Sequence, residues 1–341
     1  MKYRPLGSTG LEVSALCLGT WPLSGDWGSD VSGAVAGVRR AHDLGVNFFD
    51  TAHVMGDGAA DRGLAAGLGD VLRTKRDQVY ISAKGGIGLS AQYPGRTERS
   101  SDRQRLRAQL EASLTALGTD YVDVFFIHWP DADQPLEETA AAVQSFVDAG
   151  LIRFVGLSNH DIAQLDEFAR TVPCDVVELP YSLLARGIES DLLPYASGKG
   201  LGIMTWSALA HGLLGGELQR DSAFPADDWR SGCRLFQGET WDALHDVLEP
   251  LAALARELGS TVPALALAWI LSSPDGVVPI IGAQTAAHVD SSAAAVDIEL
   301  SPSDVERIRA IVASSPSIAL PEQFPLRRNG EPVPGERQWG S

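Results

Sequence analysis

Polar side chains that could act together stand at the ends of four short apolar runs in this 341-residue chain. They are Asp50 after "VNFF", Lys84 after "YISA", His128 after "VFFI", and Ser158 with Asn159 after "FVGL". An acid, an amine and an imidazole can together polarise a substrate, hold a developing negative charge and transfer a proton. A single lysine or histidine of this kind is often only solvated or paired for structural reasons. Four such positions at successive run ends favour a functional site.

The elements that must position these residues alternate along the chain. Eight apolar runs of the kind found in buried parallel strands cover residues 15–20, 46–52, 78–85, 121–129, 152–159, 175–181, 201–209 and 276–283. Segments with apolar residues three and four apart, which predicts helices, cover 32–44, 59–73, 103–118, 135–149, 161–172, 188–199, 239–258 and 286–295. Eight strand–helix units predict an α/β fold, a (β/α)8 TIM barrel, whose strand ends share one rim.

Four segments do not fit the plain repeat. The opening residues 3–14 are expected to form a hairpin that turns at Ser8-Thr9-Gly10, and an extra helix is expected to begin near residue 301. The long insertion 210–238 follows the seventh strand, where loops of a barrel face the site, so it is a candidate ligand cover. The tail 316–341 is rich in Pro, Gly and Arg. With no linker in between, residues 1–341 are expected to form one domain.

Composition excludes several classes of function. A formal charge of −17 and a pI near 4.7 disfavour nucleic acid and acidic membranes as partners. Cys17, Cys174 and Cys233 are widely spaced, which predicts neither disulfides nor a metal site. The N-terminus lacks the apolar core of a signal peptide, and no apolar run has the length of a membrane span, so a cytoplasmic protein that binds a small-molecule substrate is expected.

Several motifs together resemble the aldo-keto reductase superfamily. They are "LGTW" (18–21), "FFDTA" (48–52), "ISAKGG" (81–86), "VDVFFIHWPD" (122–131), "DAGLIRFVGLSN" (148–159), "LPYSLLAR" (179–186), "HGLLGGE" (211–217) and "VPIIGAQT" (278–285). They span nearly the whole chain in the family's order. The "DDWR" loop and the "YSLLAR" form are most similar to the bacterial branch that includes proteins like potassium-channel β-subunits. The resemblance implies carbonyl reduction with NADPH, NADH being the alternative, and no metal.

The resemblance also implies catalytic residues. The family's Asp, Lys and His correspond to Asp50, Lys84 and His128, and its proton-donating Tyr corresponds to Met55. A thioether has no proton to give. Loss of a general acid typically costs about 10² to 10⁴ in rate. His128 is therefore the first candidate for a replacement donor and His53 the second.

The same resemblance implies where a nicotinamide cofactor lies. Ser158 and Asn159 correspond to residues that hold the carboxamide, Glu178 replaces the Gln that helps them, and Trp206 corresponds to the aromatic that stacks on the nicotinamide. The rest of the implied cofactor site is Gly19, Thr20, Trp21 and Asp50, then Ser207 and Leu209 for the pyrophosphate, and Gly282, Ala283, Gln284, His288 and Ser292 for the adenosine end. Gln284 replaces an Arg often used for the 2′-phosphate, so NADH remains open.

A substrate pocket with aromatic walls is expected beside the nicotinamide. Its candidate residues are Trp21, Trp27, His53, Met55, Trp129 and Trp229. Such walls suit sugars and flat aromatic carbonyls.

Three functions remain open at this point. The first is an oxidoreductase acting on a carbonyl, enone, imine or sugar-derived substrate, with an atypical proton donor. The second is a protein that binds NADP(H) without turnover and acts as a sensor or scaffold. The third is a lyase or epimerase that uses Lys84 or His128 as a base. The sequence does not give the oligomeric state or the substrate.

Overall fold

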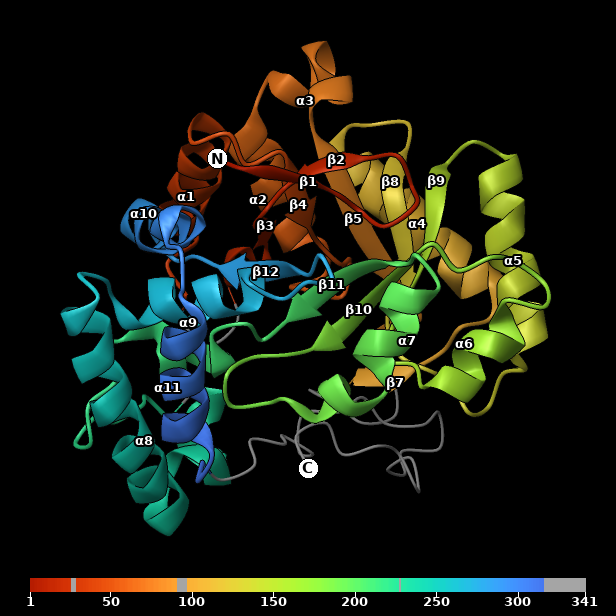
Figure 1. Cartoon of the computed structure of the whole chain (residues 1–341). Coiled ribbons are helices and arrows are strands. Elements are labelled where there is room, and N and C mark those ends of the chain that lie inside the picture. Colours follow the sequence, from red (N-terminus) through yellow and green to blue (C-terminus); the bar gives the residue numbers. More distant parts are fainter. Residues whose placement is uncertain (26–28, 91–96, 227, 316–341) are drawn as a thin grey trace.

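The computed structural model describes residues 1–25, 29–90, 97–226 and 228–315. Eight parallel strands close into one barrel, confirming the expected fold (Figure 1). In barrel order they are β3 (Cys17–Gly19), β4 (Phe48–Asp50), β5 (Tyr80–Gly85), β8 (Val122–Ile127), β9 (Ile152–Ser158), β10 (Val176–Pro180), β11 (Gly202–Trp206) and β12 (Val278–Gly282). Each lies inside one of the eight runs expected from the sequence.

Helices surround this barrel close to the expected positions. They are α1 (Val31–Asp43), α2 (Ala59–Leu68), α4 (Arg103–Leu117), α5 (Leu136–Asp148), α6 (Ile162–Phe168), α7 (Leu192–Gly198), α8 (Gly238–Glu257), α10 (Ala286–Ala293) and α11 (Pro302–Val312). The segment expected as one helix over 59–73 is interrupted at Gly69, whose φ of 56° is left-handed, and resumes as α3 (Val71–Thr74). The extra C-terminal helix α11 packs beside α8, outside the barrel (Figure 1).

Two elements differ from the expectation. A second helix, α9 (Val262–Leu271), follows α8 before β12. Its residues 263–270 are all buried and all apolar. The helix therefore has no polar face and lacks the periodicity that marks an amphipathic helix. A small antiparallel hairpin, β6 (Ile87–Leu89) with β7 (Thr97–Arg99), follows β5. Its strands have three residues each, too few to show an alternating pattern.

An N-terminal hairpin closes the end of the barrel at which the eight strands begin, at the top in Figure 1. Strands β1 (Tyr3–Pro5) and β2 (Glu12–Ser14) pair as expected, and Leu6, Leu11 and Val13 are buried with the residues inside the barrel. Gly7 lies against the backbone at Gly202, leaving no room for a Cβ. The strand residues in the same buried cluster as this hairpin include Phe48, Val124, Phe126, Val176, Met204 and Val278. The barrel interior below the rim is therefore filled with apolar side chains.

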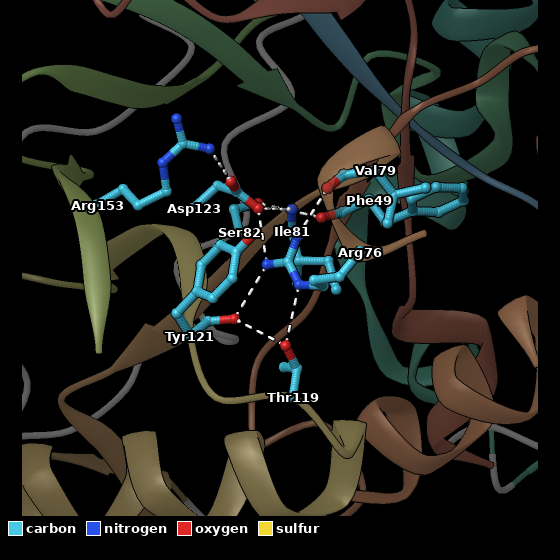
Figure 2. Close-up of polar contacts among 9 residues, drawn as sticks. All are labelled: Phe49, Arg76, Val79, Ile81, Ser82, Thr119, Tyr121, Asp123 and Arg153. Atoms are coloured by element: carbon cyan, nitrogen blue, oxygen red, sulfur yellow. Dashed lines mark hydrogen bonds and ion pairs between the residues drawn. The ribbon is translucent and has the colours of Figure 1, made fainter. Parts of the chain in front are cut away.

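A buried ion network fixes the register of three strands near the end of the barrel at which the strands begin (Figure 2). The Asp123 carboxylate on β8 has no exposed surface and accepts from Arg76 at 2.8 Å, from Arg153 at 2.8 Å and from the Ile81 amide at 2.9 Å. Arg76 also stacks on the Tyr121 ring, 4.1 Å from its centroid. This network ties β5 to β8 and β9. It therefore fixes their relative register, and with it the positions of their last residues at the C-terminal rim of the barrel.

No single helix in the part of the chain that the structure describes is long and apolar enough to cross a membrane. The helices α8 and α9 meet that length and composition only as a pair, with an 85° bend between them.

Candidate functional site

Three charged side chains from different strands meet inside the rim. Asp50 ends β4, Lys84 lies near the end of β5, and Glu178 lies in the middle of β10. Lys84 Nζ forms a short ion pair with Asp50 Oδ1 and a second with Glu178 Oε2 at 2.6 Å. Ser82 Oγ donates to Asp50 Oδ1 at 2.6 Å. The side chains of Lys84, Asp50 and Glu178 are only 2%, 4% and 3% exposed, so the cluster is held away from bulk water.

Burial and mutual charge shift the pKa values in this cluster. Burial alone would lower the pKa of Lys84, but the charges of Asp50 and Glu178 outweigh it and raise that pKa. Burial, together with the Asp50 charge and against the attraction of Lys84, raises the pKa of Glu178 to about 7. The Cys17 thiol faces the same cluster, and burial raises its pKa well above the ordinary value. Lys84 is therefore charged and Cys17 neutral at neutral pH, whereas Glu178 titrates there.

His128 lies directly after β8, and its backbone N–H donates to Gly85 O at 2.9 Å. Burial, followed by the positive charges of Lys84 and Arg99, holds the pKa of His128 well below its ordinary value. The imidazole is consequently neutral at pH 7. It can polarise a carbonyl as a hydrogen-bond donor, but it holds no spare proton to give up.

A connected set of polar groups joins His128 to the strands that follow. Asn159, in a left-handed conformation with φ of 63°, donates to His128 O at 3.0 Å and to Ser158 Oγ at 3.0 Å. Its Oδ1 accepts from the Trp206 indole N–H at 3.0 Å. The structure thus brings Ser158, Asn159 and Trp206 together at the rim, as the sequence predicts.

Two buried hydroxyl groups flank Trp206 at the end of β11. Ser207 Oγ and Thr205 Oγ1 are buried and form no hydrogen bond within the described structure. Ser207 also has φ of 59°, which turns the chain sharply after β11. A buried hydroxyl is normally satisfied. The unpartnered Ser207 hydroxyl fits a pyrophosphate oxygen as its acceptor, so the residues present fit a dinucleotide.

The residues implied for the adenosine end lie where β12 passes into α10. Gln284 N donates to His288 Nδ1 at 3.3 Å, and His288 Nε2 lies 3.2 Å from Glu217 Oε1 on the loop after β11. Ser292 is buried, whereas Gly282 at the end of β12 is exposed. His288 on α10 therefore contacts the loop after β11 through the Glu217 carboxylate.

The turn after β4 places His53 and Met55 differently. The Met55 thioether lies 3.9 Å from the hydroxyl of Thr20, which follows β3, so Met55 faces the rim. His53 contacts Asp61 and Asp57 at 3.6 and 3.5 Å, on the side of α2. Asp61 in turn accepts from Thr51 Oγ1 at 2.6 Å and Ser113 Oγ at 2.8 Å. The imidazole of His53 thus lies beside this Asp61 network, and its buried Nδ1 forms no hydrogen bond within the described residues.

The expected aromatic walls are only partly brought together. Trp129 is buried under the Arg99 guanidinium, whose Cζ is 4.8 Å from the ring centroid. Trp21 begins a short 3-10 helix over Trp21–Ser24 and is half-buried. Trp27 and the side chain of Trp229 lie outside the described residues. Sequence reasoning missed Arg99, because the segment that carries it reads as a loop.

Comparison with known proteins agrees with this geometry. The aldo/keto reductase family model matches residues 15–313. The chain belongs to the aldo/keto reductase family. An aldo-keto reductase of Bacillus subtilis is 31% identical over 95% of this chain and 97% of its own length. The NADH-specific methylglyoxal reductase of Escherichia coli is 31% identical, with 91% of this chain and 98% of that protein covered.

Other relatives extend the range within this family. A probable voltage-gated potassium channel subunit beta of Arabidopsis thaliana is 32% identical over 95% of this chain and all of its own length. Among solved structures, a glycerol dehydrogenase from Gluconobacter oxydans superposes with a TM-score of 0.82 and 29% identity, over 92% of this chain and 95% of that one. Members of this aldo/keto reductase family use nicotinamide cofactors, so an oxidoreductase is the expected type of enzyme.

Proposed function

We propose that this aldo/keto reductase catalyses nicotinamide-dependent interconversion of a small carbonyl compound and its alcohol. The observation that carries the proposal is the link between two groups through Glu178. Its carboxylate pairs with Lys84 at 2.6 Å, and its backbone carbonyl accepts at 3.0 Å from the N–H of Asn159, which holds the Trp206 indole. The cofactor, when bound, supplies or accepts the hydride. Lys84 and the neutral His128 then stabilise the oxygen on which negative charge develops.

The residues around the platform would hold the cofactor in place. Trp206 offers a ring for stacking, and its orientation is fixed by the indole hydrogen bond to Asn159. Ser158 and Asn159 are the polar groups next to it, and the unpartnered Ser207 hydroxyl would donate to a phosphate oxygen. Glu178, the remaining residue of the predicted carboxamide site, pairs with Lys84 through Oε2.

The adenosine end supports NADH over the NADPH expected from the family resemblance. His288, the titratable side chain next to Gln284, already faces the Glu217 carboxylate at 3.2 Å. A second negative group such as a 2′-phosphate would be repelled by that carboxylate. NADH carries no charge there, so we propose that it binds at least as tightly as NADPH.

Two relatives suggest the substrate class and supply probes. One is named as a methylglyoxal reductase and another as a glycerol dehydrogenase. Methylglyoxal and glycerol are a small carbonyl compound and a small alcohol. We therefore propose a small polar substrate that reaches the rim from solvent in the cytoplasm.

A direct test measures binding and turnover separately. NADH and NADPH are titrated by fluorescence into the wild type and Trp206→Ala, and methylglyoxal reduction and glycerol oxidation are followed by nucleotide absorbance. Wild-type binding weakened in Trp206→Ala, with turnover of either probe, supports the proposal. Absence of nucleotide binding by the wild type would overturn it. Glu249→Gln, on the exposed face of α8, is the control that should change neither quantity.

One observation favours a second function. Met55 has no proton to donate, and some relatives are named as potassium channel β subunits. A protein that binds the nucleotide without turnover would show wild-type NADH affinity and no oxidation of bound NADH by any carbonyl probe. In that case Met55→Tyr would be expected to create turnover that the wild type lacks.

A further inference from the structure

The Lys84–Glu178 ion pair brings a second carboxylate to the ammonium group of the site. Glu178 Oε2 lies 2.6 Å from Lys84 Nζ, and β10 and β5 are not neighbours in the barrel. The contact therefore crosses the barrel interior. Two carboxylates, Asp50 and Glu178, converge on one ammonium group, and all three side chains are at most 4% exposed.

The charge balance of this cluster calls for a proton. With both carboxylates ionised and Lys84 protonated, the cluster carries one excess negative charge in a buried place, which is costly. Other groups that face it do not offset this charge, because Cys17 is a neutral thiol and His128 a neutral imidazole. The hydroxyl of Ser82 is already donated to Asp50. A proton shared between Glu178 and Lys84 removes the excess charge.

Lys84 also has one N–H left to use. Two of its three protons point to Asp50 and Glu178; no third hydrogen-bond acceptor lies among the described residues, and the Phe126 ring centroid is 5.1 Å from Nζ. Glu178 Oε1 likewise forms no hydrogen bond to a described residue. One Lys84 N–H therefore has no hydrogen-bond acceptor among the described residues, and the Glu178 carboxylate is the ion-pair partner of Lys84 besides Asp50.

We propose that Lys84 and Glu178 together replace the phenol that is missing at position 55. This inference rests on the proposed function. As hydride reaches the carbonyl carbon and the C=O π bond becomes an alkoxide, Lys84 transfers one N–H proton to that oxygen. The Lys84 amine then takes the Glu178 carboxyl proton, leaving a carboxylate that regains a proton from water. Alcohol oxidation runs the same transfers in reverse. Lys84 is the catalytic residue, and Glu178 is the positioning residue that supplies it.

The proposal predicts opposite pH dependences for the two directions. Carbonyl reduction needs Glu178 protonated, so its rate falls about tenfold per pH unit above the pKa of this group. Alcohol oxidation needs Glu178 ionised, so its rate rises over the same range. A purely structural Glu178 would give neither dependence.

The test compares wild type with Glu178→Gln and Glu178→Asp. Infrared difference spectra of the resting enzyme across pH 5–9 report the protonated carboxyl group directly. We expect a carboxylic acid band that disappears near pH 7 in the wild type and is absent from Glu178→Gln. We also expect kcat for methylglyoxal reduction to fall at least about 10²-fold in Glu178→Gln, as for loss of a general acid, with NADH affinity kept. Glu178→Asp should recover part of this loss.

Added controls separate the possible failures. Glu178→Gln with wild-type kcat and an unchanged pH profile would overturn the proposal and leave the proposed function intact. An infrared band that persists in Glu178→Gln would also overturn it. If the wild type binds no nucleotide, the proposed function fails, and with it the catalytic role.

If circular dichroism shows that Glu178→Gln is poorly folded, Glu178→Asp decides the question. An unchanged pH profile and an unchanged infrared band in Glu178→Asp would count against the proposal. Restored turnover in Met55→Tyr/Glu178→Gln, with no pH dependence near 7, supports it.

Discussion

His53 Nδ1 lies 3.6 Å from Oδ2 of Asp61, a carboxylate with no exposed surface. The imidazole also fits against Gly58, where any Cβ would approach the ring closely. Gly58 has φ of 77°, so a side chain there would be strained as well. His53 Nδ1 forms no hydrogen bond within the described residues, so it is packing on Gly58 that keeps the ring beside Asp61.

Removing the Asp61 carboxylate should destabilise the protein. In Asp61→Ala the hydroxyls of Thr51 and Ser113 lose their acceptor, and each buried group left unpaired costs about 1–3 kcal/mol. Asp61→Asn keeps one acceptor oxygen and should lose less. Urea denaturation of both variants measures the free energies of unfolding. Equal stability of Asp61→Ala and wild type would show that the network contributes nothing.

The buried ion network around Asp123 should contribute more to the free energy of unfolding than an exposed surface ion pair. Asp123→Ala leaves the nearly buried Arg76 without its carboxylate, for which we expect a loss of roughly 3–5 kcal/mol in the free energy of unfolding. Asp290→Ala breaks the solvent-screened pair with Arg40 and should lower the free energy of unfolding far less. Denaturant melts compare the two variants. Similar losses in both would contradict the assignment of Asp123 as a structural anchor.

A small residue inside the barrel makes room for a large one. A Cβ on Gly156 would overlap the Phe126 ring, so Gly156→Ala should lower the free energy of unfolding by about 1–3 kcal/mol through overpacking. Gly156→Ala/Phe126→Leu should recover part of this loss, because the shorter side chain yields space. Gly198→Ala, with nothing within 4 Å of the new Cβ, is the matched control and should not destabilise. Calorimetry of the three variants provides the measurement.

Stability should depend on pH through Glu178. Its pKa is raised on folding from 4.5 to about 7, so the folded state holds a proton that the unfolded chain has released. Between these values the free energy of unfolding therefore falls as pH rises, and the contribution levels off above about 7. Glu178→Gln removes this group, so its stability curve should be flatter than that of the wild type between pH 5 and 7.5. Parallel curves from thermal melts would refute the shift.

Much of this protein was predictable because its signals are local. Buried parallel strands read as apolar runs, and helix faces read as three-and-four spacings, so the barrel and the rim positions of Asp50, Lys84 and His128 follow from the printed residues. The uniformly apolar helix α9 and the three-residue strands of the β6–β7 hairpin were not predictable, since neither has a period to detect.

The sequence by itself determined that Asp50, Lys84 and His128 stand at strand ends and that position 55 holds a thioether. Tertiary structure alone decided what those side chains contact. Glu178 lies 94 residues from Lys84 in the chain, and barrel closure brings its carboxylate to the ammonium group, while its carboxamide role stays a prediction. His53 lies beside Met55 in sequence, yet the packing of α2 and α4 directs it to Asp61. Periodicity fixes the face on which a residue lies, whereas its partner depends on register and closure, which no local pattern encodes.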